Sequence, residues 1–188
     1  MSIASDGQSA LTPPSSSSDD FQNHFAKRLR QVDAGERALS AWMGVRIGER
    51  ALLVPLSHAS EIAPWQKPTP VPYTKPWFMG IVGWRGELSG VVDLATFLDD
   101  KYPKRSEAQS AACRLMTFNP ALEINVALLI DQVAGLKSVA EFSQAHRPPS
   151  NTAWPFLGNL YTDQQGTTWQ ELNLQSLSAN EKFLSIGI

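Results

Sequence analysis

The pattern of hydrophobic and polar positions is most informative between residues 69 and 98, TPVPYTKPWFMGIVGWRGELSGVVDLATFL. Two apolar segments there flank the short turn WRGE at residues 84–87, and β-branched residues are frequent in both segments. The glycine of the turn supplies the backbone freedom that a tight reversal needs. The pattern predicts a β-hairpin with Arg85 near its tip. Upstream, the three prolines of residues 70–76 predict an extended and ordered connection.

Further short apolar segments bounded by turn residues predict that strands dominate the chain. A second hairpin is expected from residues 42–47 and 51–56, around Gly48-Glu49-Arg50. Other strands are expected at 114–118, 124–130, 136–140, 156–161 and 167–172, with a polar stretch at 99–110, a loop at 143–153 and a short helix at about 174–183. Because no alternation of strands and helices occurs, the pattern favours an all-β fold of small barrels or a sandwich.

The first 41 residues have a different pattern. Residues 1–20 are rich in Ser, Pro, Gly and Asp and have few large apolar side chains, which predicts a disordered tail. Residues 21–41 are expected to form an amphipathic helix, because apolar side chains recur there at spacings of three and four, at Phe21, Phe25, Leu29 and Val32. The apolar face of this helix either docks on the domain that follows or binds a partner.

Composition and charge narrow the possible functions. The chain has 188 residues, 43% of them hydrophobic, which is enough for one domain or for two small barrels sharing a core. Its formal charge is −2 and its basic residues do not cluster, so no nucleic acid partner is expected. One cysteine, Cys113, excludes an internal disulfide, and it is expected to be a small buried hydrophobe. The chain shows no secretion signal and no apolar run long enough for a membrane span, so we expect a cytoplasmic protein.

The motifs of common enzymes are absent from the sequence. Its three histidines do not have a metal-ligand spacing, and no phosphate-binding glycine motif or nucleophile elbow is present. We therefore expect no metal, no cofactor and no catalytic residue. A hydrolase that uses Asp93 and Asp131 would require these carboxylates within about 10 Å of each other in an open cleft. The simpler interpretation is that each aspartate carboxylate accepts a hydrogen bond from a turn at the end of its strand.

Several segments together resemble a known family. ALLVPLSHASEI, followed by the hairpin sequence, closely resembles the CheW-like domain of bacterial chemosensory coupling proteins. INVALLIDQVAGLKSV and TWQELNLQSL resemble a later strand pair and the closing strand and helix of that domain. The resemblance covers roughly residues 42–184, within an expected domain of residues 42–188. The preceding helix and the Pro-Trp-Phe step look most like the branch that serves type IV pilus twitching motility, the PilI-like proteins.

The resemblance implies a fold and a function. The fold is two five-stranded, SH3-like β-barrels, with an N-terminal helix and a short C-terminal helix. The function is that of a non-catalytic adaptor, which couples the cytoplasmic tip of a methyl-accepting chemoreceptor to the regulatory domain of a CheA-type histidine kinase. Such an adaptor would be recruited to membrane-associated receptor arrays and would meet the membrane only indirectly. The family's hairpin usually reads Asn-Leu-Arg-Gly, whereas residues 83–86 here read Gly-Trp-Arg-Gly.

The candidate partner-binding residues follow from this resemblance, and three of them, Arg85, Trp84 and Ile62, have an alternative role. Arg85 could fix the register of a helical partner through its planar guanidinium, or pair internally with Glu61 or Glu87. Trp84 could join the interface or fold back over the barrel. The remaining candidates are Gly86, Glu61 and Ile62, of which Ile62 could instead belong to the core. A function of another class, a small-ligand-binding β-barrel, would require a barrel mouth lined by Trp65, Trp77 or Trp84.

Overall fold

The computed structural model of the chain describes residues 40–148 and 154–188. The predicted tail of residues 1–20 lies outside these ranges, as does the predicted helix of residues 21–41 apart from its last two residues. Residues 40 and 41 belong to the first strand. The proposed division of the chain into tail, helix and domain therefore stays a prediction.

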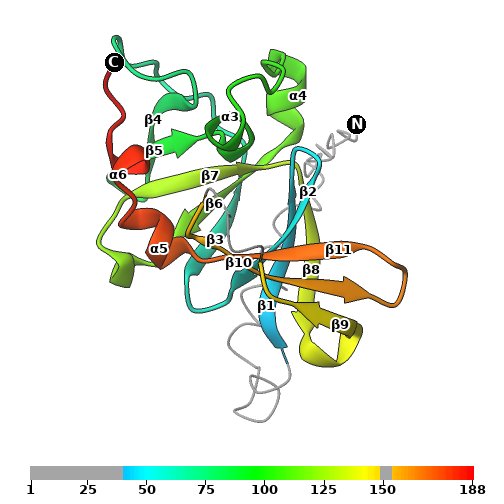
Figure 1. Cartoon of the computed structure of the whole chain (residues 1–188). Helices are drawn as coiled ribbons and strands as arrows, with labels where there is room; N and C mark the ends of the chain where they lie inside the picture. Colours follow the sequence, from blue (N-terminus) through cyan, green and yellow to red (C-terminus); the bar gives the residue numbers. More distant parts are fainter. Residues whose placement is uncertain (1–39, 149–153) are drawn as a thin grey trace, which may run out of the picture. The chain divides into compact units, whose positions relative to one another are not determined.

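Eleven strands in the described residues form two sheets, with short helices between them (Figure 1). The strands are β1 Ser40–Ile47, β2 Arg50–Pro55, β3 Ala59–Pro64, β4 Phe78–Trp84, β5 Glu87–Val92, β6 Arg114–Phe118, β7 Val126–Ile130, β8 Gln132–Ser138, β9 Phe142–His146, β10 Leu157–Asp163 and β11 Thr168–Leu172. One sheet has six strands in the order β8-β1-β2-β11-β10-β9, and the other has five in the order β3-β6-β7-β5-β4. The all-β prediction is confirmed, with one sheet larger by a strand than expected.

The two sheets are joined by a very short connection. Strand β7 of the five-stranded sheet ends at Ile130, and strand β8 of the six-stranded sheet begins at Gln132, so that Asp131 alone links them. Each sheet also contains one parallel pair: β5 lies beside β7, and β11 lies beside β2. The backbone N–H of Asp131 donates to the carbonyl of Arg46 in β1, at 2.8 Å, which ties the connection to the six-stranded sheet.

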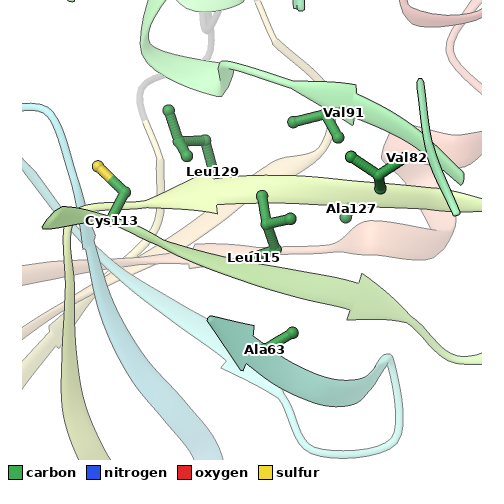
Figure 2. Close-up of a cluster of buried hydrophobic side chains, with 7 residues drawn as sticks. All are labelled: Ala63, Val82, Val91, Cys113, Leu115, Ala127 and Leu129. Atoms are coloured by element: carbon green, nitrogen blue, oxygen red, sulfur yellow. The ribbon is translucent and has the colours of Figure 1, made fainter. Parts of the chain in front are cut away.

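Each sheet has its own cluster of buried side chains. On the five-stranded sheet the cluster comprises Ala63, Val82, Val91, Cys113, Leu115, Ala127 and Leu129 (Figure 2). On the six-stranded sheet it comprises Trp42, Ala51, Leu53 and Trp169. Full burial of one large aliphatic side chain stabilises a fold by about 1.5–3 kcal/mol, so these clusters account for a large share of the stability. Burial of Cys113, which is 2% exposed, agrees with its predicted role as a small hydrophobe.

The connection that precedes the β4–β5 hairpin is ordered, as its prolines predict. The backbone of Thr69 exchanges two hydrogen bonds with that of Ile81 in β4, at 2.8 and 3.0 Å. Gly80 makes this close approach possible, because a Cβ atom there would lie 2.2 Å from the carbonyl oxygen of Thr69 and its φ is +127°. Farther along, Thr74 forms an isolated bridge with Gly187.

The helices differ from the prediction in two places. The hairpin pattern of residues 69–98 predicted no helix, but β5 ends at Val92, and α3, Leu94–Leu98, follows. Asp93 causes this change, because its carboxylate accepts the backbone N–H of Ala95 and caps the helix. The polar stretch at 99–110 likewise contains the start of α4, Glu107–Ala112, whose capping box the sequence analysis missed.

The C-terminal third contains three further corrections. Residues 143–146 were assigned to a loop, because of the two prolines after them, but they belong to β9, which pairs with β10. The strand expected at 136–140 is β8, which ends at Ser138 before a 3₁₀ turn, Val139–Glu141. The single helix expected at 174–183 is two helices, α5 Leu174–Ser178 and α6 Glu181–Leu184, because the side chain of Asn180 caps the second one.

Candidate partner-binding site

The candidate site is built on the tight turn between β4 and β5. Trp84 pairs with Glu87, so that Arg85 and Gly86 alone form the loop. Their φ angles are +51° and +86°, which is the geometry of the two-residue turns that match the twist of a hairpin. A Cβ atom on Gly86 would have no atom within 4 Å, so its φ angle, and not lack of space, requires glycine there.

This requirement gives a testable prediction with a matched control in the same hairpin. Gly86→Ala is expected to lower the free energy of unfolding by about 1–2 kcal/mol, because alanine is strained at positive φ. Gly83→Ala adds the same methyl group to an equally open position where φ is not positive, and should change stability by less than about 0.5 kcal/mol. Urea unfolding of both variants measures the difference. Equal effects of the two substitutions would contradict the assigned turn.

Arg85 pairs with Glu61 of β3 and stays open to solvent. Its Nη2 donates to Oε1 of Glu61 at 2.9 Å, while the arginine side chain is 73% exposed and the glutamate side chain 26%. The backbone N–H of Glu61 donates to the hydroxyl of Thr117 at 3.1 Å, which holds the glutamate beside β6. Because exposed ion pairs contribute about 0–1 kcal/mol, this pair orients the guanidinium more than it stabilises the fold.

A cleft of about 300 Å³ lies between the hairpin tip, β3 and the start of β7. We call it the first cleft, and six of its lining residues are Glu61, Trp84, Arg85, Thr117, Ile124 and Asn125. The Trp84 side chain is half-buried and packs against the cluster of Figure 2, so it both covers the sheet and faces the cleft.

The structure brings three of the five predicted site residues together in the first cleft, namely Glu61, Trp84 and Arg85. Gly86 shapes the turn beside them. Ile62 does not line the cleft: it pairs with the buried Met116, on the face of β3 opposite to Ala63. Its alternative role in packing therefore fits its position better.

Two residues with strained backbone angles lie in or next to the first cleft. In the described residues, three residues other than glycine have positive φ angles, namely Tyr73, Arg85 and Glu123. Arg85 lines the first cleft, and Glu123 directly precedes Ile124 and Asn125, which line it from the other side. Such strain is costly and is retained mostly at functional sites. The contribution of residues 117–126 could not be predicted from the sequence, because only strand pairing brings them beside the hairpin.

A buried charge cluster lies at the C-terminal ends of β5 and β7, away from the hairpin tip. The guanidinium of Arg105 donates from Nε to Asp93, at 2.9 Å, and from Nη1 and Nη2 to Asp131. The side chains of Arg105 and Asp93 are each 7% exposed. Burial opposes the charged form of Asp131, but hydrogen bonds from Arg105 and from the backbone N–H of Gly48 outweigh it and lower the pKa of that carboxyl.

This cluster weakens the hydrolase alternative. Asp93 and Asp131 do lie close together, since one guanidinium binds both, but neither faces an open cleft as a free acid. A carboxyl whose pKa is lowered is a poor general acid at neutral pH. The expected hydrogen bonds to turns are present, from the N–H of Ala95 to Asp93 and from the N–H of Gly48 to Asp131. The ion pairs of both aspartates with Arg105 were not predicted.

Cys113 contacts this cluster, which yields a second testable prediction. Burial, with the nearby Asp131 carboxylate, raises the pKa of the thiol to about 11. At pH 8 only about a thousandth of it would be thiolate, the reactive form. We expect the folded protein to react with a thiol reagent at least about a hundredfold more slowly than the protein in guanidinium chloride. Equal rates in the two states would contradict the buried position.

Of the three tryptophans that the small-ligand alternative names, Trp84 lines the first cleft, whereas Trp65 and Trp77 do not line it. Trp77 is 7% exposed and stacks on Phe183, with ring centroids 6.0 Å apart. Trp65 packs against the cluster of the five-stranded sheet. Within the described ranges there is no group of three or more histidine, cysteine, aspartate or glutamate side chains that could hold a metal ion. None of the helices described there is long and apolar enough to cross a membrane.

Comparisons with known proteins agree with the fold. The family model of the CheW-like domain matches residues 41–182. A protein of Rhizobium etli described as a probable chemotaxis protein CheW is 26% identical over 113 residues, which cover 60% of this chain and 68% of that protein. The crystal structure of the scaffolding protein TtCheW from Thermoanaerobacter tengcongensis superimposes with a TM-score of 0.59 at 18% identity, covering 71% of this chain and 88% of that one.

Proposed function

The chain belongs to the CheW-like domain family, and from this premise we propose that it is a non-catalytic adaptor that couples a methyl-accepting chemoreceptor to a CheA-type histidine kinase. We propose further that it acts in the cytoplasm at membrane-associated receptor arrays and that its output is type IV pilus twitching motility or chemotaxis. The scaffold and the chemotaxis setting rest on the family. The two partners and the pilus branch rest on the resemblance of the sequence.

One observation supports the proposal above the others: Arg85 is exposed and strained beside a cleft. A residue with positive φ at a hairpin tip would be more stable as asparagine or glycine. An arginine there lowers the stability of the fold, and its exposed ion pair with Glu61 offsets only a small part of that loss. A guanidinium held in a fixed direction can donate to a carboxylate or to carbonyl groups of a partner.

The first cleft suits a helical partner such as the tip of a receptor. It combines apolar surface from Trp84 and Ile124 with the polar group Arg85. A helix binds such a surface through side chains spaced three and four residues apart, and one charged contact sets its register. Arg85, Trp84 and Glu61 are the contacts we propose, with Gly86 allowing close approach of the partner.

Reconstitution from purified components tests this function. The adaptor would be mixed with a receptor cytoplasmic fragment and the kinase regulatory domain of the same cell, and complexes would be followed by analytical ultracentrifugation. We expect a ternary complex that neither partner forms without the adaptor, and a change in kinase autophosphorylation when the full-length kinase is used. If the folded adaptor binds neither partner at concentrations typical of weak array contacts, about 100 μM, the proposed function is wrong.

A further inference from the structure

A second and larger cleft lies away from the hairpin tip. Its volume is about 500 Å³, and its two walls are the β1–β2 turn and the segment of residues 99–109. The buried residues Ile47 and Ala95 contribute to its lining. We call it the second cleft. It uses none of the residues of the first cleft.

Cationic side chains outnumber carboxylates among the residues that line the second cleft. Arg50 lines one wall, and Lys101 and Lys104 line the other, all three exposed. In residues 40–148 and 154–188, no carboxylate lies within 4 Å of these three groups. The acids that line the cleft are Glu49 and Asp99, and the Asp99 carboxylate already accepts the backbone N–H of Lys101 at 3.0 Å. The whole chain has a net charge of −2, so this excess is local.

Lys101 and Lys104 belong to a segment, residues 99–109, that contacts at both of its sides hold in a fixed position. Arg105, at the end of this segment, is tied to the two aspartates of the buried cluster, and its guanidinium lies 5.4 Å from the ring centroid of Tyr102. The Tyr102 ring lies so close to Gly48 that a Cβ atom there would be 3.0 Å from it. A polar surface segment is usually mobile, whereas this one is anchored from both sides, which reduces the entropy cost of binding.

The position of the second cleft relative to the first suits a protein with two partners. The adjacent parallel strands β5 and β7 start at the first cleft, where Ser89 and Asn125 line it. Each strand is followed directly by an aspartate of the buried cluster, Asp93 after β5 and Asp131 after β7. Arg105, which binds both, lines the second cleft. Six residues of strand span about 20 Å, so two partners could be held at opposite ends without collision.

We propose that the second cleft is a docking surface for an acidic segment of a protein partner, with Arg50, Lys101 and Lys104 as its contacts. Cationic side chains on both walls complement carboxylates of a segment lying between them, and the polar rim suits a reversible contact. The proposal rests on the adaptor function only for the identity of that partner. Its test below needs neither a receptor nor a kinase, so the two can fail separately.

The experiment is a titration of the full chain with a capped hexaglutamate peptide, followed by amide chemical shifts in about 50 mM salt. We expect selective shifts at residues 48–50 and 101–105, and none with hexaglutamine. Lys101→Glu with Lys104→Glu should weaken binding by about tenfold or more. The matched control, Lys75→Glu with Lys182→Glu, changes the net charge equally at two lysines outside the second cleft, Lys182 exposed and Lys75 half-buried, and should weaken binding by less than about threefold through its long-range effect.

Three results would overturn the proposal. The first is the absence of selective shifts at these residues. The second is equal loss of binding in the two double variants, which would mean attraction to general charge only. The third is saturation of the same residues by inorganic pyrophosphate at lower concentration than by peptide, which would indicate a small-anion site. If the charge-reversed variant does not fold by circular dichroism, Lys101→Gln with Lys104→Gln replaces it, with an expected loss of about threefold or more.

Discussion

Arg85→Glu is expected to weaken receptor binding by about 2 kcal/mol or more, roughly thirtyfold, without unfolding the protein. The side chain is 73% exposed at the tip of the hairpin, so its replacement disturbs no buried contact. The reversed charge would repel an acidic group of the partner and would also face Glu61. Sedimentation or surface-based binding to the receptor fragment measures the loss, and urea unfolding measures stability. Lys75→Glu, with the same change of charge outside the first cleft, is the control.

A charge swap separates the two roles of Arg85. In Glu61→Arg with Arg85→Glu, the internal ion pair can form again with its direction reversed. If the arginine serves the fold alone, the swap should restore both stability and binding. If it contacts the partner, the swap restores stability but leaves binding weak, which is the result we expect. Full recovery of binding would assign Arg85 to the internal pair and would remove it from the proposed interface.

Arg105→Met is expected to cost about 3–5 kcal/mol of stability, a large fraction of the total for a domain of this size. The substitution leaves Asp93 and Asp131 without the guanidinium that binds both, and the Asp93 side chain is 7% exposed. Unpaired buried carboxylates are unfavourable, whereas their neutral isosteres are tolerated. Adding Asp93→Asn and Asp131→Asn to Arg105→Met should therefore recover most of the loss. If Arg105→Met lowers the free energy of unfolding by less than about 1 kcal/mol, the structural role of the cluster is contradicted.

The pH dependence of stability should reverse in the same variant. In the wild type the pKa of Asp131 is lowered, so its contribution is present above the ordinary carboxyl pKa of about 4 and is lost as the pH falls through the lower folded value. Without Arg105, the burial that raises the pKa of Asp131 is no longer outweighed, and the charged form of this carboxyl destabilises the fold. Arg105→Met should thus become more stable between pH 7 and pH 5, where the wild type changes little. If the free energy of unfolding changes with pH in the same way in the wild type and in Arg105→Met, this account is contradicted.

Both hairpins were predicted correctly, because a hairpin is determined by residues that are close together in the sequence. A glycine at a turn flanked by β-branched residues has few alternatives, and both hairpins occur where the pattern places them. The errors arose where a side chain acts on the backbone a few residues away. Asp93 ends a strand by capping a helix, and Asn180 divides one predicted helix into two. β9 has little apolar pattern because it lies at a sheet edge with most of its side chains exposed.

The sequence by itself determined the strand-rich class, the two hairpins and the placement of Arg85 at a tip, since these follow from side-chain patterns and from the φ angles that glycine permits. Tertiary structure alone decided that Glu61, 24 residues from Arg85, is its partner, that Ile62 faces the other side of the sheet, and that Asp93 and Asp131 share one guanidinium. These relations depend on strand register and on which sheet edges meet. A shift of one residue would turn every side chain of a strand to the opposite face, and no local pattern encodes the distance between strands that are far apart in the chain.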